Sequence, residues 1–384
     1  MSLVAFRHYL ATNPRYLYCL LRQKARQFRR LRWVDAHAKT NAKVPPPLVY
    51  KVTLTDRCNL ACEMCMNIPD HDSPPVRTAF TDIDFELLRR LIADVAPGTP
   101  WFILSGGEPM LHPRFADLVE LLERNSIPTN ICTNGTAIRK HLGLFEDNRF
   151  TQLTISLDGV RDDNDAIRGS GVYDTVVSAI RSLRETARRR LYIGIQHTLR
   201  PKNVASIHAF CKDMVALDVD WILLNPCWHL TQTQASRYAD FMREEHGVQA
   251  RSQQGYVMDC DIDPEVFAEQ LGRIRAEPWP IQISCYYGRP AEDLRRLQED
   301  NHYFCGNTLC YKQWLRMDVM PDGKVVSCQQ YPDVVLGDLH RERWQEVWNG
   351  KAFEGFRAAI LRRPLPVCNR CAPIYLYDRK RMHL

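Results

Sequence analysis

Residues 55–65 read TDRCNLACEMC and bring three cysteines, Cys58, Cys62 and Cys65, into one short loop. The loop follows an apolar, β-rich run at residues 48–55, and parallel sheets carry their chemistry where their strands end. Thiolates are soft ligands that suit iron–sulfur clusters and zinc. Because a closed zinc site takes four ligands, three cysteines favour a four-iron cluster that keeps one iron open to an external ligand. Unrelated thiols, or part of a zinc site, are the alternatives.

Downstream of this loop, β-rich runs alternate with helical patterns as far as residue 226. The expected strands are residues 48–55, 101–105, 128–133, 151–157, 191–198 and 219–225. The expected helices between them are residues 84–95, 114–124, 136–145, 174–187 and 203–215. This alternation predicts an α/β fold with a parallel sheet built from right-handed crossovers.

Residues 304–384 follow a different pattern. A hairpin is expected from Trp314 to Cys328, with its turn at residues 321–323, and a helix is expected around residues 341–361. This region contains four spaced cysteines: Cys310, Cys328, Cys368 and Cys371. Their chemistry suits either a second iron–sulfur cluster or a structural zinc ion.

Polar residues follow the next strands of the expected sheet. Residues 105–109 read SGGEP, and the two glycines allow a backbone to approach a ligand closely. The carboxylate of Glu108 can bind an ammonium group. Asn134 and residues 156–159 end the two strands that follow. The carboxyl ends of parallel strands meet at one edge, so these residues are expected near the cysteine loop.

The cysteine loop and the glycine motif together resemble the signature of the radical S-adenosylmethionine (SAM) superfamily. The resemblance covers about residues 48–226 and implies an open (β/α)6 partial TIM-like barrel with a [4Fe–4S] cluster on the three loop cysteines. It also implies SAM as the cofactor, with its methionine amino group held by the glycine motif at 106–108 and its ribose near the polar residues of 156–159. The cofactor-binding and pocket residues expected on this basis are Met64, Gly106, Gly107, Glu108, Asn134, Ser156, Asp158, Gln196 and Asn225.

The C-terminal cysteines resemble the SPASM/twitch extension of radical SAM enzymes, in which such cysteines ligate an auxiliary [4Fe–4S] cluster. No cysteine follows Cys371, so the match is closer to the shorter twitch form with one auxiliary cluster. A small α+β extension is therefore expected at residues 304–384, with Cys310, Cys328, Cys368 and Cys371 as ligands. A structural zinc site is the chemical rival.

The other seven cysteines need separate explanations. Cys132 and Cys211 lie within expected elements and are interpreted as small core residues. Cys260, Cys285 and Cys305 lie in the poorly patterned middle of the chain. One of these three thiols is a candidate hydrogen-atom donor to a substrate radical, and inert thiols are the alternative.

The composition excludes several classes of protein. Of the 384 residues 45% are hydrophobic and 25% charged, so the chain can bury a sizeable core. Mean hydropathy is −0.35, and no apolar run reaches the roughly 18–20 residues of a membrane span. Fourteen cysteines without a secretory signal favour a reduced compartment, so a cytoplasmic protein is expected. The absence of a Walker loop, a G-x-G-x-x-G turn and an H-E-x-x-H helix argues against nucleotide-triphosphate, nicotinamide and zinc-protease chemistry.

The net charge of +6 comes from the N-terminus. Residues 1–34 contain eight Lys or Arg and no Asp or Glu, which leaves the rest of the chain at −2. Apolar residues between Leu17 and Leu31 recur at near-helical spacing among these cations. Such a helix can pack on the barrel with a solvated charged face, lie peripherally on an anionic membrane surface, or bind nucleic acid or an acidic partner.

These patterns divide the chain into four expected parts. They are a basic arm at 1–46, a radical SAM barrel at 47–226, a connecting and substrate-contacting segment at 227–303, and the auxiliary-cluster domain at 304–384. Helical patterns near 231–246 and 263–276 are the only regular features of the connecting segment.

The resemblance implies an enzyme that reductively cleaves SAM to a 5′-deoxyadenosyl radical, which abstracts a hydrogen atom from its substrate. The electron would come from an external reductant such as flavodoxin or ferredoxin, and the auxiliary cluster would assist oxidation. The first expectation is dehydrogenation or epimerisation of a small-molecule substrate, such as a sugar, aminocyclitol or similar hydroxylated metabolite. The alternatives are modification of a peptide or protein, as in ribosomal-peptide or sulfatase maturases, modification of a membrane-associated lipid, or a non-catalytic role.

Overall fold

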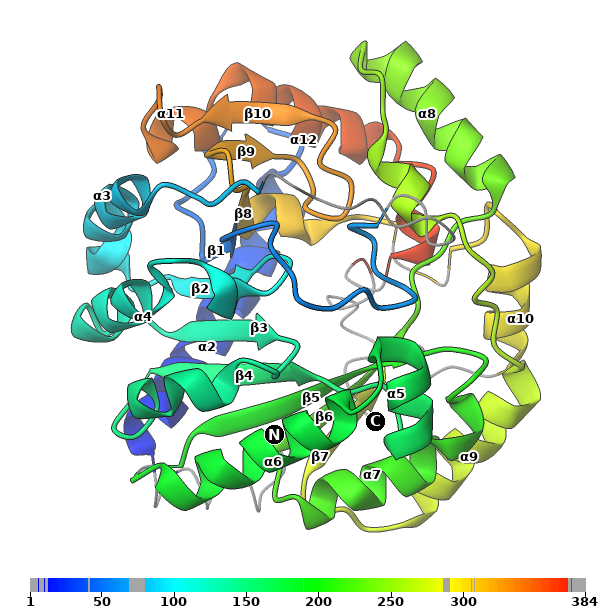
Figure 1. Cartoon of the computed structure of the whole chain (residues 1–384). Helices are drawn as coiled ribbons and strands as arrows, with labels where there is room; N and C mark the ends of the chain where they lie inside the picture. Colours follow the sequence, from blue (N-terminus) through cyan, green and yellow to red (C-terminus); the bar gives the residue numbers. More distant parts are fainter. Residues whose placement is uncertain are drawn as a thin grey trace.

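The computed structural model describes residues 13–40, 42–68, 80–148, 150–188, 190–285, 291–304 and 308–371, together with residues 6, 10, 306 and 374. Within these residues, ten strands form one sheet in the order β10-β9-β8-β1-β2-β3-β4-β5-β6-β7 (Figure 1). The strands are β1 (Val49–Thr53), β2 (Trp101–Ser105), β3 (Thr129–Thr133), β4 (Thr151–Ser156), β5 (Tyr192–Leu199), β6 (Trp221–Pro226), β7 (Gln282–Cys285), β8 (Arg316–Val319), β9 (Lys324–Val326) and β10 (Val335–Asp338).

Strands β1 to β7 lie side by side in chain order and pair in parallel. Strands β1 to β6 are the six expected from the sequence, and their arrangement confirms the α/β partial barrel with a parallel sheet. Strand β7 was not expected, because only four residues form it and a Pro-Trp-Pro stretch at 278–280 precedes it. It extends the barrel sheet into the segment that the sequence patterns described least well.

Helices cover the outer side of the barrel sheet (Figure 1). They are α3 (Phe85–Val95), α4 (Phe115–Arg124), α5 (Arg161–Arg168), α6 (Val172–Thr186) and α7 (Ile207–Ala216). The segment expected as a helix at 136–145 is instead the 3₁₀ segment η3 (Ile138–Leu144), which contains Gly143, a poor residue for an α-helix. Helix α5 was not expected, because its sequence is almost entirely polar.

The C-terminal region contains the expected hairpin, since β8 and β9 pair in antiparallel fashion. Gly323 stands in its turn with φ +78°, a left-handed conformation that favours glycine. Strand β10 adds to β9, and two helices, α11 (Trp344–Trp348) and α12 (Lys351–Arg362), replace the single helix expected at 341–361. Strand β8 also pairs in parallel with β1, so this extension continues the barrel sheet.

The described residues of the connecting segment form three α-helices. They are α8 (Gln232–His246), α9 (Pro264–Ala276) and α10 (Ala291–Glu299). The first two match the helical patterns at 231–246 and 263–276. A short 3₁₀ segment, η5 (Ser252–Tyr256), lies between α8 and α9 and packs against the cysteine loop, because a Cβ on Gly255 would lie only 2.1 Å from the carbonyl oxygen of Met66.

The basic arm forms helix α2 (Pro14–His37), which packs its inner face on the starts of the barrel strands. The ring of Tyr16 is fully buried between those of Trp101 and Tyr192. Arg30 donates hydrogen bonds to the carbonyl oxygens of Trp314 (2.6 Å) and Pro46 (2.9 Å). In the part of the chain that the structure describes, no helix is both long and apolar enough to cross a membrane.

We predict that His197 destabilises the fold in acid. It is fully buried on β5, with its ring centroid 4.6 Å from that of Phe210, and burial lowers its pKa to about 4. An unfolded histidine has a pKa of about 6.5. The contribution of the buried, neutral His197 to the free energy of unfolding is therefore complete above pH 6.5. It is lost as the pH falls toward 4, by up to about 1.4 kcal/mol per pH unit. Urea unfolding across this range measures the loss. His197→Gln should flatten this part of the profile, and an unchanged slope would contradict the prediction.

Candidate functional site

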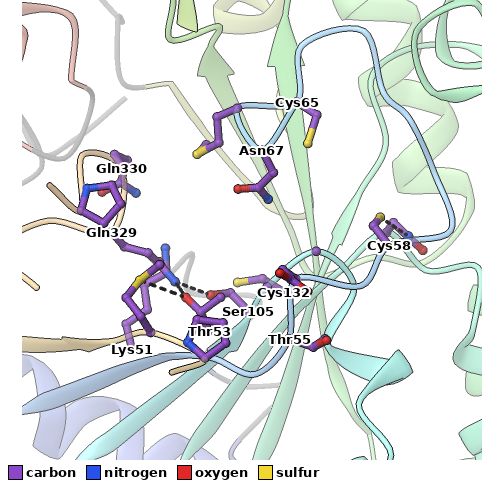
Figure 2. A pocket seen from close by; sticks show the side chains of 18 of the residues that line it. Lys51, Thr53, Thr55, Cys58, Cys65, Asn67, Ser105, Cys132, Gln329 and Gln330 are labelled. Carbon is purple, nitrogen blue, oxygen red and sulfur yellow. Dashed lines mark hydrogen bonds between the residues drawn. The ribbon is translucent and has the colours of Figure 1, made fainter. Parts of the chain in front are cut away.

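The loop cysteines Cys58, Cys62 and Cys65 line a cavity of about 740 Å³, a volume in the range typical of ligand pockets. Figure 2 shows Cys58 and Cys65 around the same space as Lys51 and Cys132, which come from strands β1 and β3. We call this space the loop cavity. It lies at the carboxyl ends of the barrel strands, as the sequence predicted for the cysteine loop.

The glycine motif holds the cysteine loop in place. The backbone N–H of Gly107 donates to the carbonyl of Thr55 (2.8 Å), and that of Glu108 donates to the carbonyl of Arg57 (2.6 Å). A Cβ would lie 2.4 Å from the Thr55 oxygen at Gly106 and 2.2 Å from the Arg57 oxygen at Gly107. Both glycines line the loop cavity, but the close approach that they permit is to the cysteine loop itself.

Glu108 does not line the loop cavity, which differs from the expected contact with the cofactor's amino group. It is fully buried, and its carboxylate accepts hydrogen bonds from the Thr133 hydroxyl (2.8 Å), the Asn134 backbone N–H (2.6 Å) and the Met110 backbone N–H (3.1 Å). Burial raises its pKa to about 7, although these three bonds oppose the shift. In this structure Glu108 therefore orders the turn after β3.

Asn134 is where the sequence placed it, in the wall of the loop cavity. Its side-chain amide donates to the Asn59 side chain (3.0 Å) and lies 3.8 Å from the Cys58 sulfur. The amide thus holds the first half of the cysteine loop. Glu108, which fixes the backbone of Asn134, acts on the loop through this residue.

Asp158 acts on the cavity through a residue that sequence reasoning missed. Its fully buried carboxylate pairs with the guanidinium of Arg168 at 2.6 Å and accepts the backbone N–H of Thr198 (2.6 Å). Arg168 lines the loop cavity and lies 3.8 Å from the sulfur of Cys62. Burial raises the pKa of Cys62 to about 11, and Arg168 is the main group that opposes this shift.

Several other expected residues can now be placed. Those in the cavity wall are Met64, Ser156 and Gln196, whereas Asn225 is buried at the end of β6 outside it. Cys132 is a correction, because it lines the cavity and does not pack in the core as the sequence suggested. Lys51 was missed, since a single lysine in an apolar strand has no motif. Burial, and next the nearby Arg316, lower the pKa of Lys51 to about 8.

The four C-terminal cysteines share a second, small cavity, lined by Cys310, Cys328, Cys368 and Cys371. Burial raises the pKa of the Cys310, Cys368 and Cys371 thiols. Among the described residues, no three His, Cys, Asp or Glu side chains are grouped closely enough to hold a single metal ion. Four thiols around one cavity are a donor set that an iron–sulfur cluster can use.

A buried ion network adjoins this second cavity. Lys312 lines it and pairs with Asp318 at 3.1 Å, while Arg316 pairs with the other carboxylate oxygen of Asp318 at 2.6 Å. The Asp318 carboxylate also accepts the backbone N–H of Gln329 (3.0 Å). Arg316 and Lys312 hold the pKa of Asp318 well below its usual range, despite its burial.

The two cavities share a wall. Gln330 lines both, and its side-chain oxygen accepts from the Cys328 thiol (3.3 Å). The hydroxyl of Tyr256 lies 2.9 Å from the Gln330 carbonyl and 2.9 Å from the sulfur of Met66 in the cysteine loop. Tyr256 therefore ties the first cysteine site to the second.

Two of the three candidate hydrogen donors lie outside the loop cavity. Cys260 is buried beside Cys227 at a small separate cavity, and Cys285 ends β7. Neither lines the loop cavity, and Cys305 lies outside the described residues. None of the described residues of the connecting segment lines that cavity, so its expected substrate contact stays a prediction.

Comparison with known families accounts for both cysteine sites. The family model of the radical SAM superfamily matches residues 52–213, and that of the SPASM iron–sulfur cluster-binding domain matches residues 310–372. The chain belongs to the radical SAM superfamily. Its C-terminal extension is a SPASM iron–sulfur domain, as the resemblance of the C-terminal cysteines implied. A SAM-binding [4Fe–4S] cluster and an auxiliary iron–sulfur cluster are its cofactors.

Two curated proteins show the range of relatives. The chain is 27% identical over 351 residues to pre-heme d1 synthase of Dinoroseobacter shibae, in a match that spans 85% of this chain and 78% of that protein. It is 31% identical over 168 residues to the mycofactocin maturase MftC of Mycobacterium tuberculosis. That match spans 43% of this chain and 41% of MftC.

The fold also resembles a solved radical SAM structure. SuiB of Streptococcus suis, bound to S-adenosylmethionine, aligns with a TM-score of 0.60 and 13% identity. The alignment covers 81% of this chain and 68% of SuiB. At this identity the likeness shows the shared fold alone.

We predict that Lys312 raises the reduction potential of the auxiliary cluster. A buried cation stabilises the more negative, reduced state, so Lys312→Met should lower the midpoint potential. The expected change in the one-electron equilibrium is at least tenfold, or about 59 mV. An EPR-monitored redox titration measures it. Lys312→Arg should keep the potential near that of the wild type, and equal potentials in the Lys312→Met variant and the wild type would contradict the prediction.

Proposed function

We propose that this radical SAM/SPASM enzyme oxidatively modifies a peptide or protein substrate and passes an electron from the substrate to its auxiliary cluster. The observation that carries the oxidation is the wall shared by the two cavities, where Gln330 contacts both. Electron transfer needs a short path between donor and acceptor, and the Cys328–Gln330 segment provides one. A substrate bound in the loop cavity would be separated from the second cysteine site by this shared wall.

Similarity supports the peptide or protein substrate. Over 168 residues the chain is 31% identical to MftC, one of the peptide maturases among its homologues. SuiB, whose fold this chain shares, has been solved with a precursor peptide bound. The sugar or aminocyclitol that the sequence first suggested has weaker support, because none of the three relatives reported above is named for such a substrate.

A tetrapyrrole is a second candidate substrate. It is favoured by the match to pre-heme d1 synthase, which spans 85% of this chain, whereas the MftC match spans 43%. A planar, carboxylate-bearing macrocycle would need a cation in the cavity, and Lys51 is available there. The two candidates differ in substrate class but share the same oxidation.

The donor set fits the cofactors. Cys58, Cys62 and Cys65 would hold the SAM-binding cluster and Cys310, Cys328, Cys368 and Cys371 the auxiliary one. When bound, SAM and its cluster supply a 5′-deoxyadenosyl radical for hydrogen abstraction.

The residues around the loop cavity have three tasks in this proposal. Asn134 and Arg168 hold the cysteine loop and lie against its sulfurs. Met64 offers an adaptable apolar contact in the cavity wall. Tyr256 and the tight packing of Gly255 on Met66 hold the chain directly after the loop in place.

The proposal includes an external one-electron reductant of the flavodoxin or ferredoxin type and a cytoplasmic location. Both follow from the need to keep the clusters reduced and intact. Fourteen cysteines, seven of them assigned to the two clusters, suit a reduced compartment.

We predict that the two cysteine sites have different functions, the first in SAM cleavage and the second in substrate oxidation. Cys58→Ala should reduce 5′-deoxyadenosine formation to background, because one cluster ligand is lost. Cys310→Ala should retain 5′-deoxyadenosine formation but lose the oxidised product. Anaerobic reconstitution with iron, sulfide, SAM and dithionite, followed by chromatography, measures the nucleoside. Equal losses in both variants would contradict separate roles.

Substrate class is tested with the wild-type protein. We expect a pool of synthetic peptides to stimulate 5′-deoxyadenosine formation and to yield a product lacking two hydrogen atoms by mass spectrometry. Stimulation by iron porphyrins alone would favour the tetrapyrrole, and stimulation by aminocyclitols alone would restore the first expectation from the sequence. Failure of all pools to stimulate while basal formation persists would count against the three classes.

A further inference from the structure

The outer face of α2 is strongly basic. Five of its cations are exposed and make no ion pair within the described part of the chain: Arg15, Arg22, Lys24, Arg29 and Arg32. No acidic residue occurs before Asp35 to neutralise them. The inner face of the same helix is packed on the barrel, so the cations have only the outside to act on. We call this outer surface the arm face.

Large apolar side chains are exposed among these cations. Tyr18 is 64% exposed, Phe28 54% and Leu21 45%, which places them among the few large apolar residues exposed in the described chain. Leu21 and Phe28 are seven residues apart, so they lie on one side of the helix two turns apart. Leu21 follows the buried Leu17 by four residues and Phe28 precedes the buried Leu31 by three, so the exposed pair borders the packed side of the helix.

A cavity of about 440 Å³ opens beside the arm face. Arg15, Arg22 and Arg26 line it together with Tyr18, and no acidic residue does so among the described ones. Arg26 donates to the carbonyl oxygens of Gly98 and Thr99, each at 3.0 Å, which fixes its position. Burial, and then the neighbouring Arg22 and Arg29, lower the pKa of Arg26, as expected where cations gather without an anion. The cavity is therefore suited to an anionic group.

We propose that the arm face and this cavity hold the protein on a bilayer surface rich in anionic phospholipid. Guanidinium groups bind phosphate, and each cation near such a surface adds to the attraction. Tyrosine and phenylalanine enter the boundary between headgroups and acyl chains, which accounts for the exposed apolar residues. A nucleic-acid backbone would use the cations and leave Leu21 and Phe28 in water.

The surface lies at the opposite end of the barrel from the loop cavity. The cavity beside the arm face is lined by residues that come just before strands β2, β3 and β4, namely Thr99, Pro128 and Phe150. Ser105 and Ser156, which line the loop cavity, end strands β2 and β4. A bilayer against α2 would thus leave the loop cavity facing the aqueous side. The arm would recruit the enzyme to the membrane without bringing an acyl chain into the loop cavity.

The test is co-sedimentation of the full chain with vesicles. We expect binding to vesicles of phosphatidylcholine with phosphatidylglycerol, and little binding to phosphatidylcholine alone. The double variant Arg22→Glu/Arg29→Glu should bind about tenfold more weakly or worse. The matched control Arg243→Glu/Arg341→Glu changes the charge equally at two exposed arginines on α8 and the C-terminal extension, and it should bind like the wild type.

A second variant separates lipid from other polyanions. Leu21→Ser/Phe28→Ser should lose the part of vesicle binding that persists at high salt, while circular dichroism and basal 5′-deoxyadenosine formation stay unchanged. No binding of the wild type to anionic vesicles, or equal loss in the control variant, would overturn the proposal. Tight binding to a DNA duplex that Leu21→Ser/Phe28→Ser leaves intact, with weak vesicle binding, would assign the face to nucleic acid instead. Because basal SAM cleavage is measured alongside, these outcomes are independent of the proposed substrate.

Discussion

The parallel pairing of β1 with β8 is the constraint on which both cysteine sites depend. Strand β1 leads into the cysteine loop, and β8 follows Cys310 and leads through β9 to Cys328. Lys51 and Asp318 are partners in this register, so the two sites are built on adjacent strands of one sheet. The shared wall at Gln330 follows from that pairing, because the chain returns to β1 after β9, where the Gln329 side chain donates to the Thr53 hydroxyl.

The same pairing concentrates positive charge between the sites. Asp318 is bound by Lys312 and Arg316, and Lys51 adds a third cation beside it. Buried charges are costly unless something opposes them. The thiolates of a bound auxiliary cluster would oppose Lys312, and an anionic group of the substrate would oppose Lys51. The network thus links the electrostatics of the electron acceptor with those of the substrate cavity.

The barrel strands and the grouping of the cysteines around two cavities could be predicted because their signals are local. Strand periodicity and cysteine spacing each involve only a few residues that are close in the sequence. The orientation of Glu108, the position of Asn225 and the exposure of Cys132 to the cavity depend on the register between strands, which the sequence does not show. Arg168 was missed for another reason, since its role comes from a buried partner, Asp158, on a different element.

The basic arm shows how one helix can satisfy two of the interpretations that its sequence left open. Its inner face packs on the barrel through Tyr16 and Arg30, while its outer face keeps its cations and apolar rings exposed. If that outer face rests on a bilayer, the loop cavity at the other end of the strands opens to water. Such an orientation suits a peptide or a tetrapyrrole that arrives from solution, and it disfavours a lipid whose acyl chains stay in the membrane.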